Sequence, residues 1–409
     1  MFDLNQFISE YVTKRPDSMF LPDMDTHEAE LSKAIKGKSI MVIGGAGSIG
    51  SSFIQEILPF EPGELYVVDT NENGLTELTR DLRSSEIYMP DTYKTYPMDY
   101  SSAVFRRMFC AHERRSGKKG FDIVANFSAH KHVRSEKDIY SIEALLRNNV
   151  IHTQRLLELL SEHSPETYFC VSTDKAANPV NIMGASKRIM EDLIFAYSDV
   201  FPVKTARFAN VAFSNGSLPD GFLKRLEKKQ PLTAPADVER FFVSPEESGQ
   251  ICMMAAMLGR NREIFFPKLD VSTMMSFDKI ALKLLETKGF VPVICKSEAE
   301  AVRLTDGLRE RQESKSYPVY FSPSDTSGEK PFEEFYTEDE KTDMVRFQSL
   351  GVITGKAKPD REKVTKLIGK LEDAFENANL RKEDIVSIIS DYLPDFHHIE
   401  TGKSLDEKM

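Results

Sequence analysis

The 409-residue sequence has few cysteines and no long apolar segment. Its four cysteines lie far apart, and none belongs to a Cys-x-x-Cys pair. This pattern favours free thiols in a reducing compartment over a disulfide framework or a zinc site, so we predict no metal. No run of about 18 apolar residues could span a membrane, and the first 20 residues contain acids and no continuous apolar core. We therefore expect no membrane span and no signal peptide, and predict a cytoplasmic protein.

The sequence also lacks a positive net charge. Lysine and arginine number 53 against 64 aspartates and glutamates, which gives a formal net charge of −11. This balance argues against a nucleic-acid or anionic-membrane surface, but it leaves room for a local basic pocket that binds phosphates. A hydrophobic fraction of 41% with well-mixed charge predicts a folded chain. The length allows a large domain and a smaller lobe, each with its own core.

Short apolar runs alternate with helical patterns from residue 39 to about 210. Strands that are apolar throughout indicate a parallel sheet covered by helices on both faces. We therefore predict an α/β fold, a doubly wound parallel sheet of the Rossmann type with a smaller C-terminal lobe. The predicted strands cover 39–45, 64–69, 121–127, 167–173 and 203–210, and the predicted helices cover 48–59, 72–86, 100–113, 139–163 and 183–199.

The alternation breaks beyond residue 215, where short strands, prolines and three more helical patterns follow (245–257, 275–288 and 296–313). Two amphipathic helices after residue 356 are expected to cover the core or an oligomer interface. Their apolar faces hold Val364, Leu367, Ile368, Leu371 and Phe375 in one helix and Ile385, Ile388, Ile389 and Leu393 in the other. The two histidines of the polar tail, His397 and His398, are expected to be solvated. The predicted divisions are an N-terminal arm (1–37), the sheet domain (38–215), a substrate lobe from which some elements can return to the sheet (216–355), and C-terminal helices with a tail (356–409).

The stretch "VIGGAGSIG" places Gly44, Gly47 and Gly50 directly after a predicted strand and at the start of a helix. Glycines allow a tight turn and the close approach of a diphosphate, which the amides and dipole of the helix N-terminus can bind. An ordinary turn is the alternative, but Asp69 ends the next strand and can accept both ribose hydroxyls while repelling a 2′-phosphate. The sequence thus predicts an NAD site rather than an NADP site. Ser48 and Ile49 complete the predicted turn.

The stretch "STDKAANPVNIMGASKR" (172–188) carries the predicted catalytic residues. Met183 and Lys187 lie four residues apart on a predicted helix and therefore share a face. Methionine cannot ionise, so a base must stand elsewhere, and Asp174 with Lys175 ends the fifth strand at the catalytic edge of such a sheet. A partly desolvated Lys175 without a tight ion pair would have a lowered pKa and could remove a proton. The alternative is a surface turn with Met183 as a core filler.

These motifs resemble those of the extended short-chain dehydrogenases that act on nucleotide sugars, over residues 38 to about 270 and more loosely to 336. The chain is most similar to the UDP-N-acetylglucosamine 4,6-dehydratases, in the branch with methionine at the helix position usually held by tyrosine. Departures from the pattern are Ala209, usually glycine, and Arg134, usually proline. The stretches that carry the resemblance are "AHKHV" (129–133), "STDKAANPVNIMGASKR", "RFANVAFSNGS" (207–217), "ERFFVSPEES" (239–248) and "SGEKPFEEF" (327–335).

The resemblance implies a reaction in which NAD takes hydride from C4 of the sugar, water is lost across C5 and C6, and hydride returns to C6. The product would be a UDP-4-keto-6-deoxy-N-acetylhexosamine for bacterial surface polysaccharide or glycan synthesis. In this scheme Lys175 removes the C5 proton, Asp174 acts as acid at the C6 oxygen, and Thr173 orients a sugar hydroxyl. Lys187 would bind the nicotinamide ribose.

Asn210 and Arg240 are the candidates for the nucleotide diphosphate, as an amide donor and a guanidinium fork. A surface salt bridge is the alternative for Arg240. Glu329 and Glu333 could reach the nucleoside ribose, or they could be ordinary loop carboxylates.

Further candidates follow the ends of other strands. Lys131 is expected near the nicotinamide, whereas His132 reads better as a hydrogen-bonded core histidine. Asn178 and Asn181 could contact sugar hydroxyls or cap the helix near Met183. Asp99 could accept from the adenine amino group or cap its own loop.

Two other functions stay open. An NAD-dependent nucleotide-sugar 4-epimerase would need no acid–base groups at C5 and C6, and a non-catalytic NAD-binding protein would explain Met183. NAD is regenerated in each dehydratase cycle, so we expect it to copurify. Relatives assemble through two helices flanking the sheet, here 100–113 and 139–163, which predicts a homodimer or larger homo-oligomer.

Overall fold

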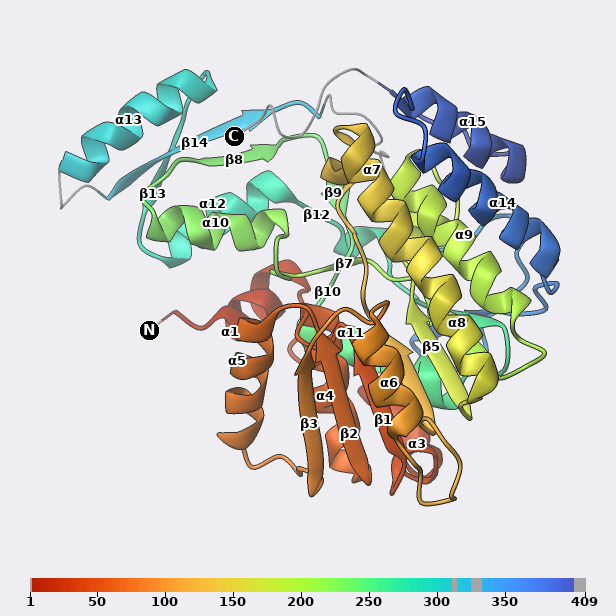
Figure 1. Cartoon of the computed structure of the whole chain (residues 1–409). Coiled ribbons are helices and arrows are strands. Elements are labelled where there is room, and N and C mark those ends of the chain that lie inside the picture. Colours follow the sequence, from red (N-terminus) through yellow and green to blue (C-terminus); the bar gives the residue numbers. More distant parts are fainter. Residues whose placement is uncertain (1, 311–314, 325–332, 401–409) are drawn as a thin grey trace.

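The computed structural model describes residues 2–310, 315–324 and 333–400 (Figure 1). Its main sheet has nine strands in the order β15-β16-β11-β6-β5-β4-β1-β2-β3. The seven strands from β11 to β3 pair in parallel, and β16 and β15 add antiparallel pairing at one edge. The strands are β1 (Ser39–Ile43), β2 (Glu64–Asp69), β3 (Thr92–Pro97), β4 (Ile123–Asn126), β5 (Thr167–Val171), β6 (Val203–Ala206), β11 (Glu263–Pro267), β15 (Thr342–Asp343) and β16 (Leu350–Ile353).

The predicted doubly wound sheet is confirmed. Strands β1, β4 and β5 are buried over almost their whole length, as continuous apolar runs require when helices cover both faces. Chain order reverses between β1 and β4, and ligands bind such sheets outside the carboxyl ends of the strands near this reversal. The covering helices are α4 (Ser48–Ile57), α5 (Glu72–Arg83), α6 (Ala103–Ala111), α7 (Ile139–Leu146), α8 (His152–Glu162), α9 (Ile182–Ala196) and α11 (Pro245–Leu258).

One predicted helix, over 139–163, is interrupted. Between α7 and α8 the chain forms a π-helical turn, η4 (Arg147–Ile151). The turn buries Asn149, whose side chain accepts from the His130 N–H at 2.9 Å and donates to the His130 carbonyl at 3.0 Å. The π turn therefore holds the loop that follows β4 at the carboxyl edge of the sheet.

The smaller lobe has its own parallel sheet, in the order β13-β14-β8, with α12 against β8 and β13, and α13 against β14 (Figure 1). A second hydrophobic core lies here, and it includes Phe7, Ile8 and Val12 from the N-terminal arm. The elements α11, β11, β15 and β16 return to the main domain. The lobe elements are α10 (Leu218–Glu227), β8 (Leu232–Pro235), α12 (Phe277–Thr287), β13 (Val291–Ile294), α13 (Glu298–Glu310) and β14 (Ser316–Ser322).

The N-terminal arm is fixed to the main domain by an ion pair and by hydrogen bonds. Arg15 donates to both oxygens of Glu247, at 2.8 and 2.7 Å, and Glu247 also closes the capping box of α11 with Ser244. Asp23 accepts from two backbone N–H groups just before β16. The arm therefore bridges both cores. Its elements are α1 (Leu4–Phe7), η1 (Ile8–Val12), α2 (Leu21–Thr26) and α3 (Glu28–Ile35).

The C-terminal helices α14 (Arg361–Phe375) and α15 (Lys382–Tyr392) pack on each other, and α14 packs on α9. Their apolar faces join the main core. Past them, the expectation of a solvated pair of histidines is half wrong. His397 is exposed, but the His398 side chain is only 9% exposed and its Nε2 lies 3.2 Å from Glu136 Oε2.

None of the described helices combines the length and the apolar character that crossing a membrane requires.

Candidate active site

The glycine turn after β1 is too tight for side chains. Gly44 has φ +74°, and Gly47 caps the N-terminus of α4. A Cβ on Gly50 would lie 2.3 Å from the carbonyl oxygen of Gly44, so helix and turn can only approach this closely with glycine. Ser48 and Ile49 form the first turn of α4 and are partly exposed. The free amides of this helix start fit a diphosphate.

Asp69 lies at the end of β2 beside this turn. Its Oδ2 accepts from the Ala46 N–H at 3.0 Å and its Oδ1 from the Asn71 N–H at 2.9 Å. The carboxylate is half-buried and held at the place where a dinucleotide ribose would meet it. Asp99 is exposed and accepts from the Ser101 N–H at 2.7 Å, which is the loop-capping geometry. The turn and Asp69 together fit NAD.

The chain after β5 turns at once into a short helix, η5 (Asp174–Ala176). Asp174 is 4% exposed, and its carboxylate accepts from Lys175 Nζ at 3.2 and 3.3 Å. The Thr173 hydroxyl donates to Asp174 Oδ1 at 2.6 Å. Three predicted catalytic residues thus form one connected group at the carboxyl edge of the sheet.

The expectation of a Lys175 without a tight ion pair is wrong. Burial acts to lower the pKa of Lys175, but the carboxylates of Asp174 and Glu333 outweigh burial, and the net pKa is raised above its ordinary value. The pair is therefore an ammonium against a carboxylate. Lys175 must lose this proton before it can act as a base.

Glu333 joins this group from a distant loop, although the sequence suggested only a contact to the nucleoside ribose or an ordinary loop carboxylate. The side chain is buried, accepts from the Asn210 amide, and accepts from the Phe241 N–H at 3.0 Å. Arg240 Nε lies 4.0 Å from Glu333 Oε1. Burial, and next the charge of Asp174, raise the pKa of Glu333 to about 7. We call Asp174, Lys175, Arg240 and Glu333 the Lys175 cluster; Glu329 lies outside the described residues.

Met183 and Lys187 share α9, but they do different things. Met183 is 2% exposed and belongs to the main core, and its N–H donates to Glu136 Oε1 at 2.9 Å. Lys187 is buried, and its Nζ donates to the Val171 carbonyl at the end of β5, at 3.0 Å. Burial lowers the pKa of Lys187. The methionine therefore offers no ionisable group, and the lysine contacts the last residue of β5, three residues before Asp174.

The remaining substrate candidates separate into two groups. Asn210, in β7 (Asn210–Val211), and Arg240, in β9 (Glu239–Arg240), both meet Glu333. Asn181 is buried and accepts from the Gly184 N–H at 2.7 Å, so it is the N-cap of α9. Asn178 is exposed and donates to Glu334 at 3.0 Å. The structure thus brings the two diphosphate candidates together and leaves Asn178 at the surface.

The loop after β4 corrects one further expectation. His132 is exposed and lies against Gly216, so it is not a core histidine. Lys131, its neighbour, is also exposed. The sequence favoured burial because the histidine follows a buried strand, but the chain has already left the sheet at Phe127.

A second charged group was missed altogether. Arg207, at the end of β6, is fully buried and donates to both oxygens of Glu191 at 2.8 and 2.7 Å and to both oxygens of Glu340 at 2.7 and 3.0 Å. Lys356 adds an ion pair to Glu340 at 2.8 Å. Arg207 also donates to the Phe335 carbonyl at 3.0 Å, two residues from Glu333. We call Glu191, Arg207, Glu340 and Lys356 the Arg207 cluster; its only sequence signal is a charged residue within the buried strand predicted over 203–210.

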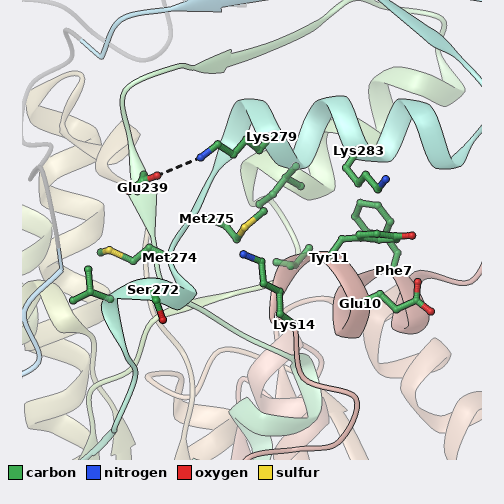
Figure 2. A pocket seen from close by; sticks show the side chains of 13 residues that line it. Phe7, Glu10, Tyr11, Lys14, Glu239, Ser272, Met274, Met275, Lys279 and Lys283 are labelled. Atoms are coloured by element: carbon green, nitrogen blue, oxygen red, sulfur yellow. Dashed lines mark ion pairs between the residues drawn. The ribbon is translucent and has the colours of Figure 1, made fainter.

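An open cavity of about 610 Å³ lies between the N-terminal arm and the lobe (Figure 2). Lys14, Lys279 and Lys283 surround it together with Tyr11, and Glu239 lines it from β9. Successive side chains of a strand point to opposite faces, so the cavity and the Arg240 side chain lie on opposite sides of β9. The cavity is therefore separate from the Lys175 cluster.

Comparison with known proteins places the chain in a family. The family model described as polysaccharide biosynthesis protein matches residues 40–354. The probable polysaccharide biosynthesis protein EpsC of Bacillus subtilis is 31% identical over 64% of this chain, which spans 42% of that relative. The UDP-N-acetylglucosamine 4,6-dehydratase (inverting) of Campylobacter jejuni is 26% identical over 57% of this chain and 67% of its own length. The UDP-glucose 4-epimerase of Rickettsia canadensis is 25% identical over 63% and 74%.

Two solved structures share the fold. Pen from Bacillus thuringiensis has a TM-score of 0.62 at 20% identity, over 83% of this chain and 98% of its own. The dTDP-glucose 4,6-dehydratase DesIV of Streptomyces venezuelae, solved with NAD, has a TM-score of 0.51 at 19% identity, over 68% and 87%. Because the family model covers most of the sequence, and the sheet, glycine turn and charged strand ends agree with it, this chain belongs to the polysaccharide biosynthesis protein family.

Proposed function

We propose that this protein is an NAD-dependent nucleotide-sugar 4,6-dehydratase that acts on UDP-N-acetylglucosamine. The observation that carries the proposal is the Asp174–Lys175 pair, linked to Thr173 and standing at the carboxyl end of β5. A buried acid and a partly exposed amine at this edge can exchange protons with a sugar, which Met183 cannot do. The relationship to the dehydratase of Campylobacter jejuni supports the choice.

NAD is the proposed cofactor because the glycine turn and Asp69 fit it, and the related DesIV structure holds it. When bound, NAD supplies the acceptor and the donor for the hydrogen at C4 and C6. Lys187, buried on α9 beside the end of β5, is proposed to donate to the nicotinamide ribose. Asp69 is proposed to accept from the adenosine ribose hydroxyls.

The proton transfers are assigned to the pair as a unit. The Asp174 carboxylate can accept a proton, and the Lys175 ammonium with which it pairs can donate one. The roles given by the resemblance, with Lys175 as base at C5 and Asp174 as acid at C6, require that one proton first leaves Lys175. A hydrogen bond of 3.2 Å between the two groups offers a direct route for it.

The nucleotide is assigned to the Arg240 side of the cluster. Arg240 can bind a phosphate in bidentate fashion and Asn210 can donate its amide hydrogens. Both lie next to Glu333, within the reach of a UDP-sugar whose hexose faces Asp174 and Lys175. The proposed dehydratase would supply a 4-keto-6-deoxy sugar for polysaccharide synthesis.

The test is to incubate the purified protein with UDP-N-acetylglucosamine and to record product mass and the NMR spectrum. We expect a product lighter by one water with a 4-keto group, and the C5 configuration then gives inversion or retention. The matched variants Asp174→Asn and Lys175→Ala should form no product while the fold and bound NAD survive. A product of unchanged mass would overturn the proposal.

The alternative is a nucleotide-sugar 4-epimerase, which the relationship to the epimerase of Rickettsia canadensis favours. An epimerase moves only the C4 hydrogen and has no use for a buried pair at C5 and C6. Unchanged mass together with a new C4 configuration would identify it, and Lys175→Ala would then keep much of the activity.

We propose that the predicted homo-oligomer forms through α6 and through the helical segment of α7, η4 and α8, which correspond to the predicted helices over 100–113 and 139–163. These helices expose Val104 and Tyr140, which are 49% and 79% accessible in the single chain. Light scattering of the purified protein tests it: we expect twice the monomer mass or more, and a smaller mass for Val104→Glu.

A further inference from the structure

Glu333 connects two parts of the site that the proposed reaction uses separately. Toward the nucleotide it accepts from the Asn210 amide and lies 4.0 Å from Arg240 Nε. On the side of the proton-transfer groups, the negative charge of Glu333 acts on Lys175, and so does the negative charge of Asp174. A single buried carboxylate therefore stands between the groups proposed to hold the diphosphate and the groups proposed to move protons.

The position of Glu333 is fixed from outside the site. Two residues along the chain, the Phe335 carbonyl accepts from Arg207 at 3.0 Å, and Glu340 in the same segment is held by Arg207 and Lys356. The Phe241 N–H donates to the second Glu333 oxygen at 3.0 Å. The carboxylate cannot simply swing into water when a ligand arrives, so it must change its protonation or share its partners.

A diphosphate competes with Glu333 for the same donors. Guanidinium and amide groups bind phosphate oxygens as they bind a carboxylate, and each phosphate adds a negative charge. When Asn210 and Arg240 turn to the phosphates, Glu333 loses two stabilising contacts and gains a negative neighbour. Both changes favour its protonated form.

This inference rests on the proposed function. We propose that binding of the nucleotide diphosphate drives Glu333 to take up one proton from solvent. Lys175 then faces one carboxylate instead of two. Glu333 is thus a positioning residue that couples occupation of the nucleotide site to the charge of the Asp174–Lys175 pair. The step makes and breaks only the bond between this proton and the Glu333 carboxylate. The charged groups that act on Glu333 are Asp174, Lys175 and Arg240.

The test uses proton linkage and needs no turnover. UDP affinity is measured by calorimetry from pH 7.5 to 9, where the terminal phosphate has already lost its proton. The pKa of Glu333 is about 7 before binding, so the group is mostly ionised in this pH range. If binding takes up one proton, the affinity of the wild type for UDP should fall by up to about tenfold for each unit that the pH rises. Buffers of different ionisation enthalpy report the same proton directly.

Glu333→Gln should bind UDP with a flat pH dependence and no proton uptake, whereas Glu333→Asp should keep the dependence. Glu334→Gln, a neighbouring carboxylate that accepts from Asn178, is the matched control and should behave as the wild type. Equal pH slopes in wild type and Glu333→Gln would overturn the inference and leave the proposed function standing. If the wild type does not bind UDP at all, the UDP-linked substrate fails, and the inference fails with it.

Discussion

The Lys175 cluster and the Arg207 cluster each contain two acids and two bases, and both are largely buried. In the Arg207 cluster, the charges meet through short hydrogen bonds of 2.7 to 3.0 Å to both oxygens of each carboxylate. In the Lys175 cluster, the corresponding contacts are 3.2, 3.3 and 4.0 Å. The two clusters have the same composition of acids and bases, but the charges are closely paired in the Arg207 cluster and loosely paired in the Lys175 cluster.

The pKa values follow this difference. The pKa of Glu340 is held at about 2: burial acts to raise it, and the hydrogen bond and charge of Arg207 more than reverse that effect. The pKa of Glu333 is raised to about 7 because burial and Asp174 prevail over its partners. The closely paired Glu340 therefore stays ionised, whereas the incompletely paired Glu333 can exchange a proton near neutral pH. The Arg207 cluster thus has the properties of a structural ion-pair network, and the Lys175 cluster has those that the proposed chemistry needs.

The largest effect is expected in the chemical cluster. Lys175→Met keeps the length of the side chain but removes the charge and the exchangeable proton, and general acid–base groups contribute about 10²- to 10⁴-fold to rate. We expect kcat of dehydration to fall by that range, as measured by formation of the 4-keto product. Circular dichroism and copurified NAD should be unchanged. Near-normal turnover would remove this cluster from the chemistry.

The structural cluster should show the opposite pattern, with a large loss of stability. Arg207→Met leaves two buried carboxylates with the cations of Lys356 and Arg188 at 2.8 and 3.6 Å from Glu340 but without the guanidinium that joins them, and breaking a buried ion pair in this way costs about 3–5 kcal/mol. Arg240→Met is the matched substitution in the other cluster. It should cost much less, because Glu333 can take up a proton instead of staying charged. Free energies of unfolding from urea titrations compare the two, and equal losses would contradict the distinction.

The sequence was informative where the determinants are local. Continuous apolar runs predicted the parallel strands, and the spacing of Gly44 and Gly50 predicted the tight turn, because both patterns depend on neighbouring residues. Asp174 and Lys175 were correctly predicted at the carboxyl edge of the sheet, because they directly follow the end of a predicted strand. The direction of the Lys175 pKa shift was mispredicted, because the side chain pairs with its neighbour Asp174 and because Glu333, 158 residues further along the chain, adds a second negative charge.

Long-range pairing also explains the other corrections. His398 meets Glu136 only because α14 and α15 return the chain to the start of α9. In the Arg207 cluster, Arg207 at the end of β6 pairs with Glu191 of α9 and with Glu340 in the segment before β15. No local sequence pattern predicts that these residues come together. Whether a buried charge is paired closely or loosely depends on side-chain geometry in the folded protein, which spacing along the chain cannot supply.

The pH dependence of stability gives a third, smaller difference. Between pH 4.5 and 7 the folded protein keeps a proton on Glu333 that the unfolded chain releases, so the free energy of unfolding falls as pH rises through this window. Glu340 acts in the other direction: its contribution is present above pH 4.5 and is lost as pH falls toward 2. Each effect is at most about 3 kcal/mol.

Urea titrations at pH 5, 6, 7 and 8 measure the first window. The difference in free energy of unfolding between Glu333→Gln and wild type should grow in favour of the variant as pH rises, and then level off above pH 7. Glu340→Gln should stay less stable than wild type throughout, since it loses a hydrogen-bonded carboxylate. Parallel curves for Glu333→Gln and wild type would show that Glu333 does not hold its proton near neutral pH.

The smallest effect is expected at Met183, which stands where related enzymes keep an ionisable phenol but belongs here to the hydrophobic core. Met183→Leu conserves volume, so it should cost less than about 1.5 kcal/mol, and its N–H can still donate to Glu136. Because the proton transfers are assigned to the Lys175 cluster, kcat should stay within about threefold of wild type. A hundredfold loss of kcat in a folded, NAD-bound variant would instead require the Met183 thioether to contact the reacting sugar. Met183 would then belong to the catalytic groups and not to the hydrophobic core alone.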